Sequence, residues 1–238
     1  MSSYLIPNHV YLCKTSDGVV FLNLRKDKYL GIGGEELSHL RPLIAGWPVA
    51  QVAEATLPMH SRACQIAAEL HRAGLLTMDK TVGKMACPPE LQQAESSILE
   101  QPAKAHPRTS AFLLARIAYA AAIVSSILRF RSLEGAVNRI RSRRYEHRAP
   151  PGSETTTSIV ALTLTFFRLR PLLYSSRNRC LYDCLVLHEF LSGFGSVPAF
   201  VLGVTTFPFK AHCWLQAGPE VLTDYWENTR RYTPILVA

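Results

Sequence analysis

The sequence predicts an α+β protein with two domains. In the first third, three short strand patterns separated by turn residues are followed by three helical patterns. In the rest, four helical patterns precede three strand patterns, and a proline-containing stretch separates the two parts. The 238 residues suffice for two domains, and a hydrophobic content of 48% suffices for packed cores.

The N-terminal domain is expected to span residues 1–80. Three strands are predicted at residues 9–14, 19–24 and 28–32. Three helices are predicted at residues 35–45, 48–56 and 61–73, with a short wing strand at 75–77. This order is similar to a winged helix-turn-helix, whose commonest use is DNA binding. The third helix carries only Arg62, His71 and Arg72 as basic or near-basic groups, too few to read a groove, so we expect no nucleic acid partner.

Residues 81–107 contain four prolines and indicate a linker, with a short helix expected at 89–100. The second domain, residues 108–238, starts with helices and ends with strands. Helices are predicted at residues 110–131, 133–144, 158–168 and 177–191. Strands are predicted at residues 197–204, 211–217 and 220–225.

The segment 111–128 is almost entirely apolar and carries one charge, Arg116. A membrane span needs ~20 apolar residues, and a mid-span arginine costs about 2.5–3.5 kcal/mol on insertion scales. We therefore expect a buried or partly exposed helix of a soluble protein, without membrane contact. Peripheral contact through this helix and the arginines that follow it is the alternative.

The net charge of +8 arises largely between residues 129 and 148, which include seven arginines. Such a run most often forms a solvated face, and we expect one here. The six cysteines are scattered, and residues 1–8 are too short and polar for a signal peptide. We therefore expect free thiols and a cytoplasmic location.

Cys180, His212 and Asp224 form a candidate catalytic set. Cys180 falls at the start of a predicted helix just after Arg177 and Arg179, where the helix dipole and the two cations favour a thiolate. Asp224 on the last predicted strand could orient His212, which could then serve as the base for the thiol. Cys184, one turn further along the helix, is expected to be a small core residue.

For Asp224 to face His212, the hairpin that carries them needs a loop with an odd number of residues. A loop of residues 217–219 would pair 216 with 220, 214 with 222 and 212 with 224. The alternative chemistry is a zinc site built from Cys180, Cys184 and His188 together with His212 and Cys213. No CxxC pair exists and Asp224 would have no role, so no metal or other cofactor is expected.

Three runs carry a family resemblance: CLYDCLVL at residues 180–187, Gly203-Val204, and PFKAHCW at residues 208–214. They resemble the B protein of lasso peptide biosynthesis, a leader peptidase from a bacterial branch of the transglutaminase-like cysteine proteases. The resemblance covers about residues 110–238 and implies a papain-like or transglutaminase-like α+β peptidase domain. It implies Cys180 as the nucleophile, His212 as general base and acid, and Asp224 as the residue that orients His212.

Four features depart from the family pattern without removing a catalytic atom. Cys184 stands in place of serine, Cys213 in place of alanine, and Gln216 in place of a common acidic residue. Gly218-Pro219 replaces a turn that often contains Asp-Gly.

The first 80 residues resemble the leader-recognition element of peptide-modifying systems. In such elements the leader peptide adds as a strand to the third β-strand and packs against the third helix. The resemblance implies Tyr29, Leu30, Ile32 and Leu70 as leader contacts. Core packing is an equally open interpretation for each of them.

The function implied is a cysteine peptidase that binds and removes the leader peptide of a ribosomally synthesised lasso peptide precursor. The freed core N-terminus would pass to an ATP-dependent lasso cyclase for macrolactam formation. The precursor and the cyclase are the implied partners. Two alternatives stay open, a non-catalytic leader-binding scaffold and a transglutaminase-like acyl transferase.

Overall fold

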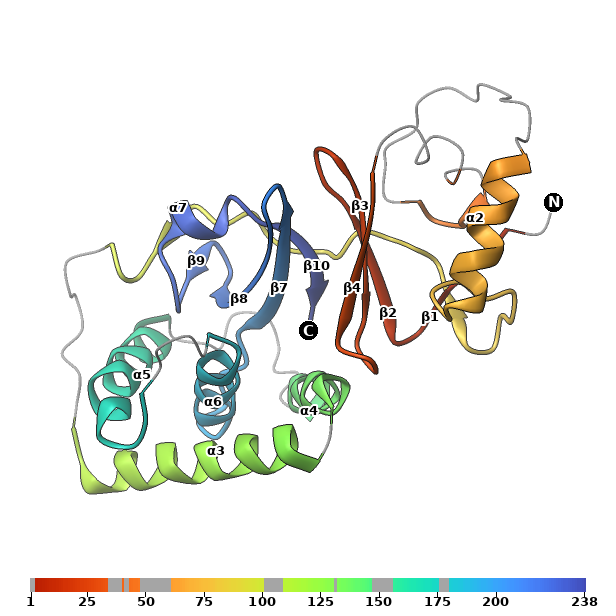
Figure 1. The fold of residues 1–238 in the computed structure, drawn as a ribbon. Helices are drawn as coiled ribbons and strands as arrows, with labels where there is room; N and C mark the ends of the chain where they lie inside the picture. The colour runs from red at the N-terminus through yellow and green to blue at the C-terminus, as the bar shows by residue number, and fades with distance from the viewer. Residues whose placement is uncertain are drawn as a thin grey trace. The chain divides into compact units, whose positions relative to one another are not determined.

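The computed structural model describes residues 3–33, 40, 43–47, 61–100, 109–130, 132–146, 156–175 and 180–238 (Figure 1). The chain forms two compact units. Unit 1 comprises Met1–Glu90, Val204–Lys210 and Thr233–Leu236. Unit 2 comprises Leu91–Gly203, Ala211–Tyr232 and Val237–Ala238.

Unit 1 contains an antiparallel sheet in the order β2-β3-β4. Its strands are β2 (Val10–Lys14), β3 (Gly18–Asn23) and β4 (Lys28–Gly33). The register places Phe21 opposite Leu12 on one side and Leu30 on the other. The turn into β4 is held by the Asn23 side chain, which accepts the N–H groups of Arg25 and Lys26 at 3.1 Å each. The three strands predicted at residues 9–14, 19–24 and 28–32 are therefore confirmed.

Helix α2 (Ser61–Arg72) confirms the third predicted helix. Its Ala67 and Leu70 are buried in one core with Val10 and Phe21 of the sheet. Gly74, at φ 75°, ends the helix in the left-handed conformation that glycine adopts without strain. The predicted helices at 35–45 and 48–56 lie mostly outside the described residues, so the winged helix-turn-helix stays a prediction. Of the predicted wing strand at 75–77, only Thr77 pairs, in a single bridge with Leu5.

Residues 81–100 differ from the expected linker. Two short strands occur there, β5 (Gly83–Lys84), which pairs with β1 (Ile6–Pro7), and β6 (Ser96–Ser97), which pairs in parallel with β9 (Glu220–Val221). The short helix expected at 89–100 was therefore wrong. Ser97 of β6 also contacts the chain after β9 through its side chain, because its Oγ donates to the Asp224 carbonyl at 2.6 Å.

The helices of unit 2 pack around α6 (Figure 1). They are α3 (Ala111–Phe130), α4 (Leu133–Glu146), α5 (Thr156–Leu169), the short 3₁₀ helix η2 (Arg170–Leu172) and α6 (Cys180–Ser192). Every residue of α6 from Cys184 to Ser192 is buried. All four predicted helices are present, and α6 is the central one because α3, α4 and α5 all pack against it.

The second sheet has the strand order β10-β7-β8-β9-β6. Its further strands are β7 (Ala199–Thr206), β8 (Phe209–Ala217) and β10 (Thr233–Val237), and the short helix α7 (Trp226–Thr229) precedes β10. The sequence predicted β7 and β8 but not β10. The predicted strand at 220–225 is confirmed only for β9, because the chain bends from Leu222 to Asp224.

The predicted register of the β8–β9 hairpin was wrong. Gln216 pairs with Val221 and Ala217 with Glu220, so the loop contains only Gly218 and Pro219. Gly218 has a φ of 57°, which suits the first position of a tight two-residue hairpin turn. With this register, a regular strand would place Asp224 on the opposite face from His212.

An ion network joins α4 to α6. Glu189, with only 7% of its side chain exposed, accepts hydrogen bonds from Arg139 at 2.6 and 2.8 Å and from Arg143 at 3.0 Å. Burial raises the pKa of Glu189, but the two arginines outweigh it and lower the pKa overall. Two of the arginines expected on a solvated face therefore anchor the helix that carries Cys180.

We predict that Glu189→Gln lowers the free energy of unfolding by about 1–3 kcal/mol, measured by urea denaturation. Breaking a buried ion pair usually costs about 3–5 kcal/mol. The expected loss is smaller here because both arginines are partly exposed to solvent. Since the folded state lowers the Glu189 pKa, the contribution is complete above the ordinary pKa of glutamate. It disappears as the pH falls through the folded-state pKa.

Glu146→Gln is the matched control, because its carboxylate is exposed and lies 3.4 Å from the same Arg143. It should cost less than about 1 kcal/mol. Equal losses in both variants would show that the network does not anchor α6.

Candidate active site

Cys180 is the first described residue of α6 and is exposed at the start of the helix. The exposed N–H groups and the dipole at this end of a helix favour a negative charge. The preceding Arg177 and Arg179, which the sequence analysis invoked, lie outside the described residues. Cys184, one turn further, is 2% exposed and fills the core as expected.

His212 on β8 is hydrogen-bonded to Asp224, with 2.7 Å between Nε2 and Oδ2. An ionised carboxylate can only accept, so Nε2 carries a proton and Nδ1 is the nitrogen left for the thiol. The side chain of His212 also makes a hydrogen bond to Cys180. The structure therefore brings Cys180, His212 and Asp224 together in that order.

The bend after Val221 explains how Asp224 reaches His212 despite the even-numbered loop. The Leu222 N–H still donates to the Leu215 carbonyl at 2.8 Å, as a continuing ladder requires. The Leu215 N–H, however, donates to Thr223 Oγ1 at 3.0 Å. A side-chain oxygen thus accepts the hydrogen bond that a backbone carbonyl would accept in a regular strand. The ladder ends there, and the chain turns Asp224 to the side of His212.

Cys180 and His212 form an ion pair. Hydrogen bonds from Cys213 and His212 lower the pKa of Cys180 to about 4, against the effect of burial. Burial lowers the pKa of His212, but its bonds to Asp224 and Cys180 prevail and raise the pKa to about 10. Between these values the site holds a thiolate beside an imidazolium, which is the reactive form of such a pair.

Cys213 keeps its proton and stabilises the thiolate. It is 2% exposed, and its hydrogen bonds to Cys180 and Cys184, together with burial, raise its pKa. A neutral thiol beside a thiolate can only donate. The position where the family resemblance expects alanine thus supplies a donor to the nucleophile.

Several supporting residues were missed by the sequence analysis. Asn228 Nδ2 and the Tyr225 N–H donate to Asp224 Oδ1 at 3.1 and 2.7 Å. Together with His212, they lower the Asp224 pKa although burial raises it. Ser97 holds the Asp224 backbone, and its contact comes from 127 residues away. Of these contacts, the one that the sequence could have suggested is Asn228 with Asp224, because the two residues are only four apart.

Aromatic rings enclose His212. The ring of Trp214 stacks with it at 6.3 Å between centroids, and the ring of Tyr232 lies at 5.2 Å. Gly203 on β7 makes room for both, since a Cβ there would lie 2.8 Å from Trp214 and from Tyr232. The glycine of the Gly203-Val204 motif is therefore needed for packing around the histidine.

The zinc alternative gains no support from the described part of the chain. No group of three or more His, Cys, Asp or Glu side chains is arranged there to hold a metal ion. His188, one of its ligands, is 2% exposed within α6.

The leader contacts implied for unit 1 are divided between strand and core. Leu30 on β4 is 42% exposed, Ile32 is half-buried, and the Tyr29 ring packs against Phe209 at 5.4 Å. Leu70 is 4% exposed within the core, as the packing interpretation expects. β4 is an edge strand, with no described strand on its other side.

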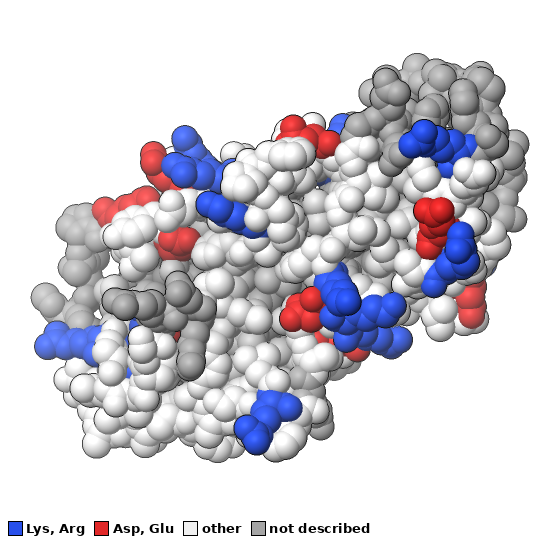
Figure 2. All heavy atoms as spheres, in the orientation of Figure 1, with Lys and Arg blue, Asp and Glu red and all other residues white. Residues whose placement is uncertain are grey.

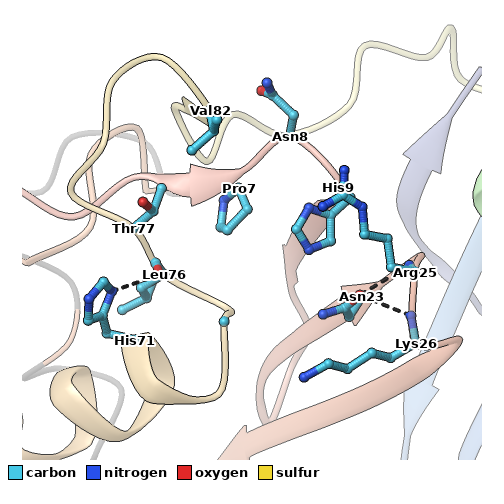
Figure 3. Close-up of a pocket in the computed structure, with 11 residues that line it drawn as sticks. Pro7, Asn8, His9, Asn23, Arg25, Lys26, His71, Leu76, Thr77 and Val82 are labelled. Atoms are coloured by element: carbon cyan, nitrogen blue, oxygen red, sulfur yellow. Dashed lines mark hydrogen bonds between the residues drawn. The ribbon is translucent and has the colours of Figure 1, made fainter.

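A pocket of about 460 Å³ opens beside this sheet (Figure 3). Its basic or potentially basic lining residues are His9, Arg25, Lys26 and His71, and none of its described lining residues is acidic. Lys26 Nζ donates to the Ala73 carbonyl at 3.3 Å, and His71 Nδ1 lies 3.0 Å from the Leu76 carbonyl. The lining favours an anionic group such as a peptide carboxylate.

We predict that alkylation of Cys180 by iodoacetamide is nearly independent of pH between about 5 and 8. An ordinary thiol reacts about tenfold faster per pH unit in this range, because only the thiolate is a nucleophile. Cys180 is expected to be ionised throughout, since the pair loses its charges only below about 4 and above about 10. Peptide mapping by mass spectrometry gives the rate at each cysteine.

The exposed Cys64 and Cys87 serve as internal references in the same digest. His212→Ala and Cys213→Ala should each restore a rise in Cys180 reactivity with pH, because each removes a hydrogen bond that lowers the Cys180 pKa. A steep pH dependence in the wild type would contradict the ion pair.

One comparison with known proteins found a match. Residues 120–237 match the family described as the transglutaminase-like superfamily. Searches of curated proteins and of solved structures gave no match. The matched range contains Cys180, His212 and Asp224 and the mixed helices and strands around them. The chain therefore carries a transglutaminase-like superfamily domain at residues 120–237, from a superfamily that includes cysteine peptidases and transferases.

Proposed function

We propose that the protein is a cysteine peptidase that removes the leader from a ribosomally synthesised precursor peptide, as a lasso peptide B protein does. The observation that carries the proposal is the position of His212, hydrogen-bonded to Asp224 on one side and to Cys180 on the other. This order is the one that nucleophilic catalysis by a thiol needs.

In the proposed reaction, the Cys180 thiolate attacks the scissile carbonyl and forms a tetrahedral oxyanion. The backbone N–H of Cys180 is the first oxyanion donor, and Asn178, considered as a second, lies outside the described residues. His212 gives its Nδ1 proton to the leaving amine, which becomes the N-terminus of the core peptide. His212 then takes a proton from water, which hydrolyses the acyl-enzyme.

Leader recognition is assigned to unit 1. The edge of β4 offers backbone groups to an extended peptide, and Leu30 offers apolar surface beside them. Holding the leader on the same chain as the peptidase would raise the effective concentration of the cut site to ~mM for a short flexible connection. An ATP-dependent lasso cyclase would receive the freed core, and the reaction needs no cofactor in a cytoplasmic protein.

We predict that wild-type protein releases the leader from a precursor encoded in the same gene neighbourhood and that Cys180→Ala does not. Mass spectrometry of the products places the cut, with and without the cyclase. The matched control is Cys184→Ala, which removes a core thiol and leaves the nucleophile. Release by the Cys180 variant would exclude this nucleophile.

The same spectra separate the two other candidate functions. Acyl transfer, which the superfamily also supports, would give a leader joined to an amine, whereas hydrolysis adds one water. A recognition scaffold would bind the peptide and leave it intact in both variants.

We also predict that Leu30→Asp raises the KM for the precursor about tenfold and leaves kcat nearly unchanged. The charge would remove apolar contact with the leader, and a factor of ten corresponds to ~1.4 kcal/mol of binding energy. Leu172→Asp is the control, because Leu172 is 70% exposed on η2 in unit 2. Equal KM values for the wild type and the Leu30 variant would remove β4 from the recognition site.

A further inference from the structure

The most apolar helix of the protein lies largely at the surface. The buried residues of α3 (Ala111–Phe130) are Ile117, Ala120 and Val124, and its other residues are exposed or partly exposed. Among the described helices, α3 is the one whose length and composition would allow it to cross a membrane. A helix that covers a soluble core normally turns its apolar side inward. An exposed apolar side such as that of α3 indicates an interaction surface.

Three aromatic residues form a line along the exposed side. Phe112, Tyr119 and Phe130 are 64%, 63% and 78% exposed. At ~100° and ~1.5 Å per residue, they point within about 20° of one another over ~27 Å. Three further positions on this side, Ala115, Ala122 and Ser126, are also exposed and uncharged. We call these six residues the α3 ridge.

A groove of about 810 Å³ continues the ridge toward α4. Its α3 wall is apolar, with Ile123 and Ile127 beside ridge residues, and its α4 wall carries Asn138 and Ser142. Tyr145, one turn beyond Ser142, is 80% exposed. The apolar surface therefore has a polar border on α4.

The border is strongly cationic. Residues 111–146 contain seven arginines and two glutamates, a net formal charge of +5. Arg139 and Arg143 donate hydrogen bonds to Glu189, whereas Arg129 and Arg144 are exposed. In Figure 2 the side of unit 2 formed by α3 is mostly white, with isolated blue cations.

We infer that the α3–α4 face binds the surface of an anionic membrane, with α3 lying in the plane of the interface. An apolar side with aromatic residues, bordered by arginines, is the pattern of interfacial helices, and anionic headgroups complement the exposed Arg129 and Arg144. Spanning is excluded by the packing of α3 on α4, α5 and α6. Arg116 also ties α3 to the end of α6, since its Nη2 donates to the carbonyl of Gly193, the residue that follows α6, at 3.0 Å.

The charge argues against two other occupants. A second copy packed on the same face would bring the exposed Arg129 and Arg144 of one copy near those of the other, which like-charge repulsion opposes. A nucleic acid duplex would meet the arginines but would leave the aromatic ridge without a partner, since a duplex presents phosphates at its surface and keeps its bases stacked inside.

The test is flotation of the full-length protein with vesicles of phosphatidylcholine alone or mixed with phosphatidylglycerol. We expect binding to the mixed vesicles that weakens with salt, and little binding to phosphatidylcholine alone. Phe112→Ser with Phe130→Ser should reduce the partition coefficient at least tenfold. Arg129→Gln with Arg144→Gln should reduce it about 25-fold, at about fivefold per arginine.

Phe207→Ser is the matched control, because Phe207 is 83% exposed outside α3 and α4. Thermal unfolding and Cys180 alkylation, both without vesicles, check that each variant folds. Vesicle binding that is absent, or unchanged in the ridge variant, would overturn the inference. A dimer in sedimentation equilibrium that the ridge substitutions dissociate would overturn it too, and would assign the face to a second copy.

Discussion

The chemistry of the site depends on the hydrogen bond between His212 and Asp224. Burial alone would lower the His212 pKa and favour a neutral ring, but the bonds to Asp224 and Cys180 raise it instead. The imidazolium, together with the Cys213 thiol, stabilises the thiolate of Cys180, whose pKa falls to about 4. One 2.7 Å contact between β8 and the bend after β9 therefore contributes to the charge of a cysteine on a separate helix.

That contact depends in turn on a break in regular structure. The two-residue loop at Gly218-Pro219 would turn Asp224 away from His212 if β9 continued. Thr223 ends the ladder with its side chain, and Ser97 of β6 holds the Asp224 carbonyl in the bent conformation. A segment that the sequence marked as linker is thus part of the support of the active site.

The sequence predicted much of this arrangement and failed where long-range contacts decide. Strands β2, β3, β4, β7 and β8 and the helices of unit 2 follow local periodicity, which a single sequence displays. Cys180, His212 and Asp224 could be chosen by residue type and spacing. Strand β6 and the role of Ser97 could not, because each depends on residues far apart in the chain. The register could not either, because the sequence around Gly218-Pro219 allowed both a two-residue and a three-residue loop. β10 was missed although it lies in the second sheet, since its run is short and contains Pro234.

The packing around α6 explains why α3 can leave its apolar side exposed. Cys180 requires a rigid helix, and α6 gains rigidity from burial on all sides between Cys184 and Ser192 and from the anchor of Glu189 to α4. α3 packs against this core through the side away from the ridge, where Ile117, Ala120 and Val124 are buried. Its ridge is therefore dispensable for holding the nucleophile, and substitutions there should change what the surface binds without changing the Cys180–His212 pair.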